Sequence, residues 1–248
     1  MNIAHPSMSF SRSNKSRPVV SRIEDRLSLS FDALRVQSEM RLDAPDELVL
    51  GYTRTMMGFL LFCPHPASIA MIGLGGGSLT KYCHANLSDT TITVAEIDPQ
   101  VIALRERFFI PPDDERLQIL CEDGAAFVQR AIAQYDVLLV DGFTGSGQPP
   151  VLSTQRFYND CHVCLRANGI LVVNLSDISA SFEPLLARIR HSFGQAVLVV
   201  DAEDSNNRIV FAGKGQILNI SHEQLLGRLA LLDAHLPLKL HRTLQAMR

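Results

Sequence analysis

The chain has 248 residues, of which 46% are hydrophobic and 20% charged, and its formal net charge is −3. This length and composition suit one large α/β domain, and the small negative charge gives no attraction to nucleic acid or anionic membranes. No apolar run approaches the length of a membrane span. The five cysteines are odd in number and scattered, so we expect reduced thiols and a cytoplasmic protein.

The first 44 residues contain two kinds of segment. Residues 1–18 are rich in Ser and Arg, contain no Asp or Glu, and predict a disordered tail, with an organelle transit peptide as the alternative. Apolar and polar residues alternate in "RLSLSF" and "LRVQSEM", which predicts a small β-hairpin unit within residues 19–44 and a turn at Asp32–Ala33. The stretch "APDELVLGYTRTMMGFLLF" then predicts a helix with Pro45 near its first turn.

The remainder of the chain, from residue 45 to 248, reads as one β-α domain. The segments that predict strands are "SIAMIGL", "TITVAEI", "LQILCE", "YDVLLVD", "GILVVNL", "AVLVVDA" and "RIVFAG". Apolar strands that alternate with helices predict a mostly parallel sheet covered on both faces. The turn-like "EDSNN" between the last two strands favours an antiparallel pair, and Ser221–Leu240 predicts a covering helix.

Glycines or acidic residues follow each of the first four predicted strands. They are Gly73, Gly75 and Gly76, then Glu96 and Asp98, then Glu122, Asp123 and Gly124, and finally Asp141. Ligands of open α/β sheets bind beyond the carboxyl ends of the strands, so we expect these residues to form one site. Acids and glycines are also common in ordinary βα loops, and Asp141 could simply cap a helix.

Each of these residue types has a use in binding an adenosine-like ligand. Glycines let the backbone approach the ligand closely. A carboxylate after the second strand can accept hydrogen bonds from two ribose hydroxyls, and an Asp after the third from the adenine amino group. Asp141 then faces the reacting end. A dinucleotide fingerprint is the competing interpretation, but Ser78 replaces its third glycine, and the acids favour a cationic sulfonium over a pyrophosphate.

The motifs "VQSEM", "GLGGGS", "EID", "EDG", "YDVLLVDGF", "LSTQRFY" and "LRANGILVVNL" together resemble the spermidine synthase family, and more closely its bacterial spermidine-synthase-like branch. The resemblance covers roughly residues 37–175. It implies a methyltransferase-like Rossmann fold with a mostly parallel seven-stranded sheet behind a small N-terminal β unit. It also implies transfer of an aminopropyl group from decarboxylated S-adenosylmethionine to an amine, without a metal.

By matching position, the resemblance implies roles for individual residues. Gln37 and Tyr52 would line the amine and cofactor pocket, Glu96 would hold the ribose, and Asp123 the adenine amino group. Asp141 matches the catalytic carboxylate. Two further positions, Thr144 and Tyr158, are expected beside the amine substrate. We also expect a homodimer.

The chain departs from the family pattern at several acids. Gly76 stands where the family has an Asp beside the aminopropyl nitrogen, Thr144 replaces the second acid of a conserved block, and Thr53–Arg54 replace His–Glu. Partly buried ammonium groups need carboxylate partners, so these departures predict a poor site for putrescine. Without the acid at Gly76, and with Lys81 nearby, intact S-adenosylmethionine becomes an alternative donor.

Three functions therefore remain open from the sequence. The first is a spermidine-synthase-like aminopropyltransferase in which Asp141 accepts the proton of the attacking amine or orients it. The second is a methyltransferase or other S-adenosylmethionine enzyme on the same fold. The third is a non-catalytic protein that binds an adenosyl ligand. The eight histidines are dispersed and do not predict a metal site.

Overall fold

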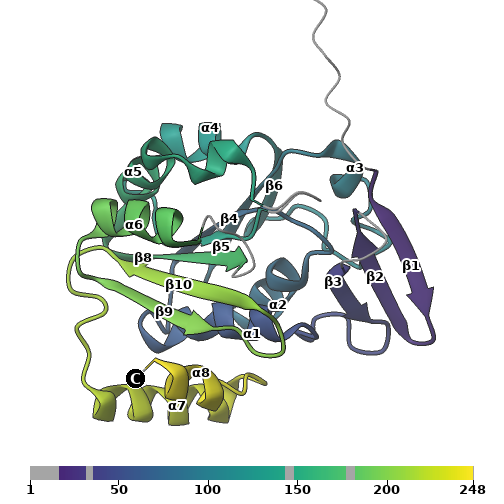
Figure 1. The fold of residues 1–248 in the computed structure, drawn as a ribbon. Helices are drawn as coiled ribbons and strands as arrows, with labels where there is room; N and C mark the ends of the chain where they lie inside the picture. Colours follow the sequence, from purple (N-terminus) through teal and green to yellow (C-terminus); the bar gives the residue numbers. More distant parts are fainter. Residues whose placement is uncertain (1–16, 32–35, 143–147, 177–181, 248) are drawn as a thin grey trace, which may run out of the picture.

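The computed structural model describes residues 17–31, 36–142, 148–176 and 182–247. It contains a three-stranded sheet of order β1-β2-β3 and a seven-stranded sheet of order β6-β5-β4-β7-β8-β10-β9. Figure 1 shows the small sheet beside the large one, close to helices α2 and α3. The fold is therefore α/β with a mostly parallel seven-stranded sheet, as predicted. Most of the predicted tail, residues 1–16, lies outside the described residues.

The N-terminal β unit has one strand more than the sequence predicted. Its antiparallel strands are β1 (Val19–Ile23), β2 (Arg26–Ser30) and β3 (Val36–Arg41). Strands β2 and β3 form the predicted hairpin, and the predicted turn at Asp32–Ala33 lies outside the described residues. Strand β1 was not predicted because it is largely exposed and so lacks a clean apolar alternation.

The first helix begins later than predicted. Helix α1 spans Gly51–Met56 and continues as a 3-10 helix, η1, over Met57–Leu61. The expected start near Pro45 is wrong because residues 42–50 form turns and bends. The side chain of Arg54 fixes this arrangement, since its Nη1 donates to the carbonyl oxygens of Leu48 at 2.8 Å and Val49 at 2.9 Å.

All seven predicted strands of the large sheet are present. They are β4 (Ser68–Ile72), β5 (Thr91–Glu96), β6 (Leu117–Cys121), β7 (Tyr135–Val140), β8 (Leu165–Ser176), β9 (Val197–Asp201) and β10 (Asn207–Gly213). Strands β4 to β8 pair in parallel. The predicted antiparallel pair of β9 and β10 is confirmed, and β10 also pairs antiparallel with β8. Strand β9 therefore lies at the edge of the sheet.

Helices cover both faces of the large sheet (Figure 1). They are α2 (Ser78–Asn86), α3 (Pro99–Ile102), α4 (Gly124–Arg130), α5 (Gln155–Cys164), α6 (Phe182–Phe193), α7 (His222–His235) and α8 (His241–Ala246), with a 3-10 turn η2 at Pro150–Ser153. Alternate residues of β4 enter opposite cores, with Ile69 and Met71 in one and Ala70 and Ile72 in the other. Burial of both faces explains the continuous apolar runs in the sequence.

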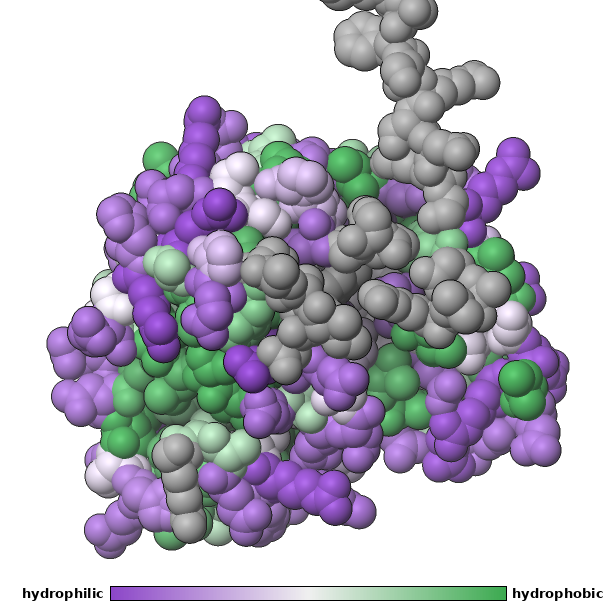
Figure 2. All heavy atoms as spheres, viewed as in Figure 1, coloured by the Kyte–Doolittle hydropathy of each residue, from purple (hydrophilic) through white to green (hydrophobic). Residues whose placement is uncertain are grey.

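The covering helix predicted for the C-terminal region is α7. Ser221 caps it, and Gln224 completes a capping box by accepting from the Ser221 N–H. Figure 2 shows apolar side chains gathered on the surface around the edge of the large sheet, where the half-buried strand β9 lies. Within the described part of the chain, no helix combines the length and the apolar character that crossing a membrane requires.

Candidate active site

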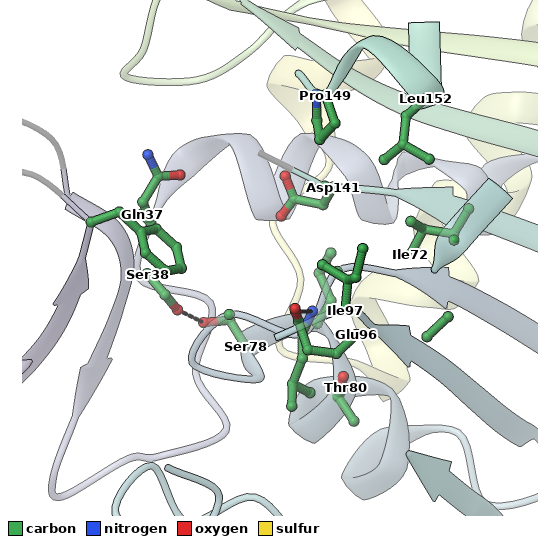
Figure 3. A pocket seen from close by; sticks show the side chains of 18 of the residues that line it. Gln37, Ser38, Ile72, Ser78, Thr80, Glu96, Ile97, Asp141, Pro149 and Leu152 are labelled. Atoms are coloured by element: carbon green, nitrogen blue, oxygen red, sulfur yellow. Dashed lines mark hydrogen bonds between the residues drawn. The ribbon is translucent and has the colours of Figure 1, made fainter. Parts of the chain in front are cut away.

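A pocket opens at the carboxyl ends of strands β4, β5 and β7, beside the first turn of α2 and strand β3. We call it the glycine-loop pocket. Its described lining residues are Phe31, Gln37, Ser38, Tyr52, Thr53, Ile72, Gly73, Leu74, Gly75, Ser78, Leu79, Thr80, Ala95, Glu96, Ile97, Asp123, Gly124, Asp141, Gly142, Pro149, Val151 and Leu152. Figure 3 shows Asp141 between Gln37 on one side and Ile72 and Leu152 on the other, with Glu96 and Ile97 below.

The glycine-rich loop between β4 and α2 follows a path that a side chain would block. Gly73 has φ +95°, and a Cβ added there would lie 2.5 Å from the carbonyl oxygen of Asp141. Its N–H donates to the carbonyl of Ala95 at 2.9 Å, which joins the end of β4 to β5. Gly73 is thus required for the ends of β4 and β7 to meet, and this close approach brings Asp141 to the pocket.

Glu96 is held rigidly at the end of β5. One carboxylate oxygen accepts from the Leu74 N–H at 2.9 Å, and the other accepts from the Asp98 N–H at 2.8 Å. Burial raises the pKa of Glu96, although these backbone donors act in the opposite direction. A carboxylate has about four acceptor positions, so Glu96 keeps acceptor capacity for a hydroxyl group of a ligand.

Asp123 combines a structural and a ligand-facing position. It is the N-cap of α4, and its Oδ1 accepts from the N–H groups of Ala125 at 2.9 Å and Ala126 at 3.0 Å. The side chain also lines the glycine-loop pocket. Capping uses only one carboxylate oxygen and fixes the rotamer, so Oδ2 stays available to a donor on a ligand.

Asp141 is held by two neutral donors. Asn174 Nδ2 donates to Oδ1 at 2.8 Å, and the Tyr52 hydroxyl donates to Oδ2 at 3.1 Å. Burial raises the pKa of Asp141, while both hydrogen bonds lower it and only partly offset the burial. The Tyr52 hydroxyl also lies 3.2 Å from the Gln37 carbonyl oxygen, and its single proton can serve only one of the two acceptors at a time. Asp141 is therefore a carboxylate of increased basicity in a fixed orientation.

A second cavity adjoins the first, and we call it the turn pocket because the β9–β10 turn forms part of its wall. Its lining residues are Arg26, Val36, Gln37, Glu39, Val49, Leu50, Gly51, Tyr52, Asp141, Asn174, Asp204, Ser205, Asn206 and Asn207. Gln37, Tyr52 and Asp141 line both cavities. Asp141 thus lies where two different molecules could meet.

The glycine-loop pocket carries negative charge. Its acidic lining residues are Glu96, Asp123 and Asp141, and no Lys, Arg or His is among its described lining residues. The rest of the wall is largely apolar, with Ile72, Leu152 and other aliphatic side chains. Such a pocket attracts a ligand with a positive centre and a flat apolar part, and it repels a phosphate.

Two of the predicted site acids are not among the lining residues of either cavity. Asp98 is the N-cap of α3, where its Oδ1 accepts from the Gln100 N–H at 2.9 Å. Glu122 forms an ion pair with Arg130 of α4, at 2.6 Å. Neighbouring extended residues point to opposite sides, which explains why Asp123 lines the pocket and Glu122 does not.

Two other predicted site residues, Gly76 and Tyr158, also line neither cavity, and Thr144 cannot be placed. Gly76 is absent from the described lining, and a Cβ there would lie 2.6 Å from Ser38 Oγ and 2.9 Å from the Phe108 ring, so an acid at this position would require these side chains to move. Tyr158, on α5, is fully buried with its ring against Phe157, and it is not among the lining residues of either cavity. Thr144 lies outside the described residues.

Lys81 and Arg54, which the sequence placed near the substrates, lie elsewhere. The Lys81 ammonium is buried and donates to the Phe108 carbonyl at 2.9 Å, and burial lowers its pKa to about 8. Lys81 lines neither cavity. Arg54 pairs with Glu203 at 3.2 Å and Asp204 at 3.3 Å in the β9–β10 turn. Its charge therefore neutralises acids beside the turn pocket.

Asn174, Ser38 and Ser78 were not among the site residues that the sequence predicted. Asn174 is near the carboxyl end of β8, so the same inspection of strand ends that found Asp141 could have found it. Ser38 and Ser78 lie with their hydroxyl oxygens 3.2 Å apart and join β3 to the first turn of α2 (Figure 3). No local signal predicts that pair, because the residues are 40 positions apart.

Comparisons with known proteins agree with this geometry. The family profile described as "Spermine/spermidine synthase domain" matches residues 49–201. A polyamine aminopropyltransferase of Neisseria meningitidis is 36% identical over 223 residues, which are 89% of this chain and 85% of that protein.

Two solved structures share the fold. A spermidine synthase in complex with the transition state analogue AdoDATO superposes with a TM-score of 0.71 and 19% identity, over 97% of this chain and 84% of that one. Human methyltransferase-like protein 13 in complex with SAH has a TM-score of 0.67 and 22% identity, over 80% of this chain and 94% of that one. At these identities the two structures support the Rossmann-like fold of the chain.

Proposed function

Because this chain belongs to the spermine/spermidine synthase family, it is a transferase, and we propose that it moves an aminopropyl group from decarboxylated S-adenosylmethionine to an amine. One observation carries this proposal. The glycine-loop pocket has the three carboxylates Glu96, Asp123 and Asp141 in its wall and no basic side chain among its described lining residues. A sulfonium donor is cationic, so this charge distribution stabilises it.

The proposed donor lies along the strand ends. Its ribose hydroxyls donate to the free acceptor positions of Glu96, and its adenine amino group donates to Asp123 Oδ2. The adenine ring contacts the aliphatic wall that includes Ile97, Leu152 and Val151. The sulfonium and the aminopropyl chain then extend toward Asp141 at the junction of the two cavities.

The same charges favour the decarboxylated donor over the intact one. Intact S-adenosylmethionine carries an additional carboxylate, which would be repelled by the acids of the glycine-loop pocket. The nearest candidate partner in the sequence, Lys81, is buried against Phe108 and lines neither cavity. A carboxylate removed from water without a cationic partner costs several kcal/mol.

The proposed reaction is a direct displacement. The amine nitrogen forms a bond to the carbon next to sulfur, the carbon–sulfur bond breaks, and its electron pair leaves with sulfur as neutral methylthioadenosine. The amine gives its proton to Asp141, whose basicity burial increases. Asn174 and Tyr52 hold the carboxylate in line between the two substrates. Within the described residues there is no cluster of three or more metal-ligating side chains.

Calorimetry with both donors, followed by mass spectrometry of the products, tests the proposal. We expect decarboxylated S-adenosylmethionine to bind at least about tenfold more tightly than the intact form, a difference of about 1.4 kcal/mol. Methylthioadenosine and an aminopropylated amine should then appear. Tighter binding of the intact donor, or its conversion to S-adenosylhomocysteine, would favour the methyltransferase alternative. Binding of either donor with no turnover on a panel of amines would favour a non-catalytic binding protein.

Assembly and cellular location stay as predictions. We expect a homodimer, and sedimentation equilibrium of the full chain measures the mass that decides this. A monomer across the micromolar range would contradict the prediction. We also expect the protein in the cytoplasm, which fractionation of the source cells would test.

A further inference from the structure

The turn pocket is the place where an acceptor must bind if the proposed function holds. It shares Asp141 with the glycine-loop pocket, so an amine in it reaches the proposed donor only beside that carboxylate. Its wall contains the acids Glu39, Asp141 and Asp204. The partners of these acids decide how many positive charges the pocket can receive.

Two of the three acids already have a guanidinium partner. Glu39, on β3, forms an ion pair with Arg26 of β2, and its side chain is only 17% exposed. Asp204, in the β9–β10 turn, lies 3.3 Å from Arg54 Nη2. Arginine remains protonated at any physiological pH, so these pairs do not release their acids by titration.

Asp141 differs from the other two acids because its partners are neutral. The Asn174 amide and the Tyr52 hydroxyl donate to it without supplying a positive charge. Asp141 can therefore bind one ammonium group, or take up its proton. The described wall of the turn pocket offers no second acid without an arginine partner.

The wall of the turn pocket also offers uncharged polar groups. Ser205 and Asn206 of the β9–β10 turn and Asn207, the first residue of β10, line this pocket with neutral hydrogen-bonding side chains. A second ammonium would have to displace Arg26 from Glu39 or Arg54 from Asp204, or stay without a carboxylate partner, and each of these arrangements is unfavourable. A hydroxyl or an amide carries no positive charge and therefore needs no carboxylate partner.

Resting on the proposed function, we propose that the acceptor is an amine with a single cationic centre and a polar far end that carries no positive charge. The turn pocket then binds amino alcohols, amino amides and similar compounds in preference to diamines. Arg26 and Arg54 determine this specificity, because their guanidinium groups occupy the acids that a second ammonium would need.

Two acceptors of the same chain length test the proposal. Putrescine has an ammonium at each end, whereas 4-aminobutan-1-ol replaces one of them by a hydroxyl. With decarboxylated S-adenosylmethionine as donor, we expect kcat/KM for the amino alcohol to exceed that for putrescine by about tenfold or more. Equal values, or a preference for putrescine, would overturn this inference and leave aminopropyl transfer intact. If the donor binds and neither amine is converted, the proposed function fails, and the inference fails with it.

A matched pair of variants tests the part assigned to Arg26. Arg26→Gln removes the guanidinium and frees Glu39, so kcat/KM for putrescine should rise several-fold relative to that for the amino alcohol. Arg22→Gln removes the same charge from the neighbouring strand β1, outside the turn pocket, and should change neither value. The Arg26 side chain is 50% exposed, so the variant is expected to fold, which its melting temperature verifies. An unchanged ratio of the two acceptors in Arg26→Gln would refute the proposal.

Discussion

Replacing Asn174 by leucine should make Asp141 a stronger base. The substitution removes the 2.8 Å hydrogen bond from Nδ2 to the Asp141 carboxylate and leaves a side chain of similar size. This bond favours the charged form, so its loss raises the pKa of Asp141, in the same direction as burial does. A hydrogen bond to a charged group contributes about 1.5–3 kcal/mol, and one pKa unit corresponds to about 1.4 kcal/mol. The expected rise is therefore about one to two units.

Carbon-13 NMR of protein labelled at the aspartate carboxyl carbons measures this rise directly. The resonance of Asp141 is assigned by its absence in Asp141→Asn, and its chemical shift is followed against pH in the wild type and in Asn174→Leu. Tyr52→Phe removes the second donor and should raise the same pKa. Because protonated Asp141 cannot accept the proton of the amine, the rate of methylthioadenosine release should begin to fall at a higher pH than in the wild type as the pH is lowered.

Asn86→Leu is the matched control for this experiment. Asn86 ends helix α2 and donates to the Tyr82 carbonyl at 2.9 Å, outside both cavities. The same change of residue type there should leave the titration of Asp141 unchanged. If Asn174→Leu also leaves it unchanged, the hydrogen bond does not control this carboxylate and the reasoning is refuted.

Three further substitutions separate chemistry, donor binding and folding. Asp141→Asn should lower turnover by about 10²–10⁴-fold. Its melting temperature at neutral pH should stay equal or rise. The reason is that burial raises the pKa of Asp141 in the folded protein, so the charged carboxylate destabilises the fold at pH values above that pKa. Glu96→Gln should weaken donor binding by about tenfold or more in calorimetry, because the new amide group would face the N–H of Leu74 or Asp98. Gly73→Ala should lower the free energy of unfolding by about 2 kcal/mol or more in urea titrations, since the added Cβ would lie 2.5 Å from a carbonyl oxygen at φ +95°.

Two of these three substitutions, Glu96→Gln and Gly73→Ala, have a control in the same chain. Glu115→Gln alters an exposed acid away from both cavities and should leave donor binding unchanged. Gly227→Ala adds a methyl group where no atom lies within 4 Å, in the interior of α7, and should stabilise the protein slightly. Wild-type turnover in Asp141→Asn would remove that residue from the mechanism. Normal donor affinity in Glu96→Gln would place the ribose elsewhere.

The sequence alone identified the strands of the large sheet and the acids at their ends. Strands buried on both faces, such as β4, must be apolar throughout, and that constraint leaves a continuous run that is visible in the sequence. Parallel strands place their carboxyl ends at the same edge of a sheet, so residues after separate strands could be assigned to one site. Glu96, Asp123 and Asp141 were brought together in this way.

Only the tertiary structure decided which neighbours of those acids line the pocket. Glu122 and Asp123 are adjacent in sequence, but one pairs with Arg130 and the other caps α4 at the pocket. Asp141 and Asn174 are 33 positions apart, and their contact depends on the pairing of β7 with β8. The turn pocket depends on the packing of β2, β3, α1 and the β9–β10 turn. Such contacts join distant segments, and local periodicity carries no information about which segments will meet.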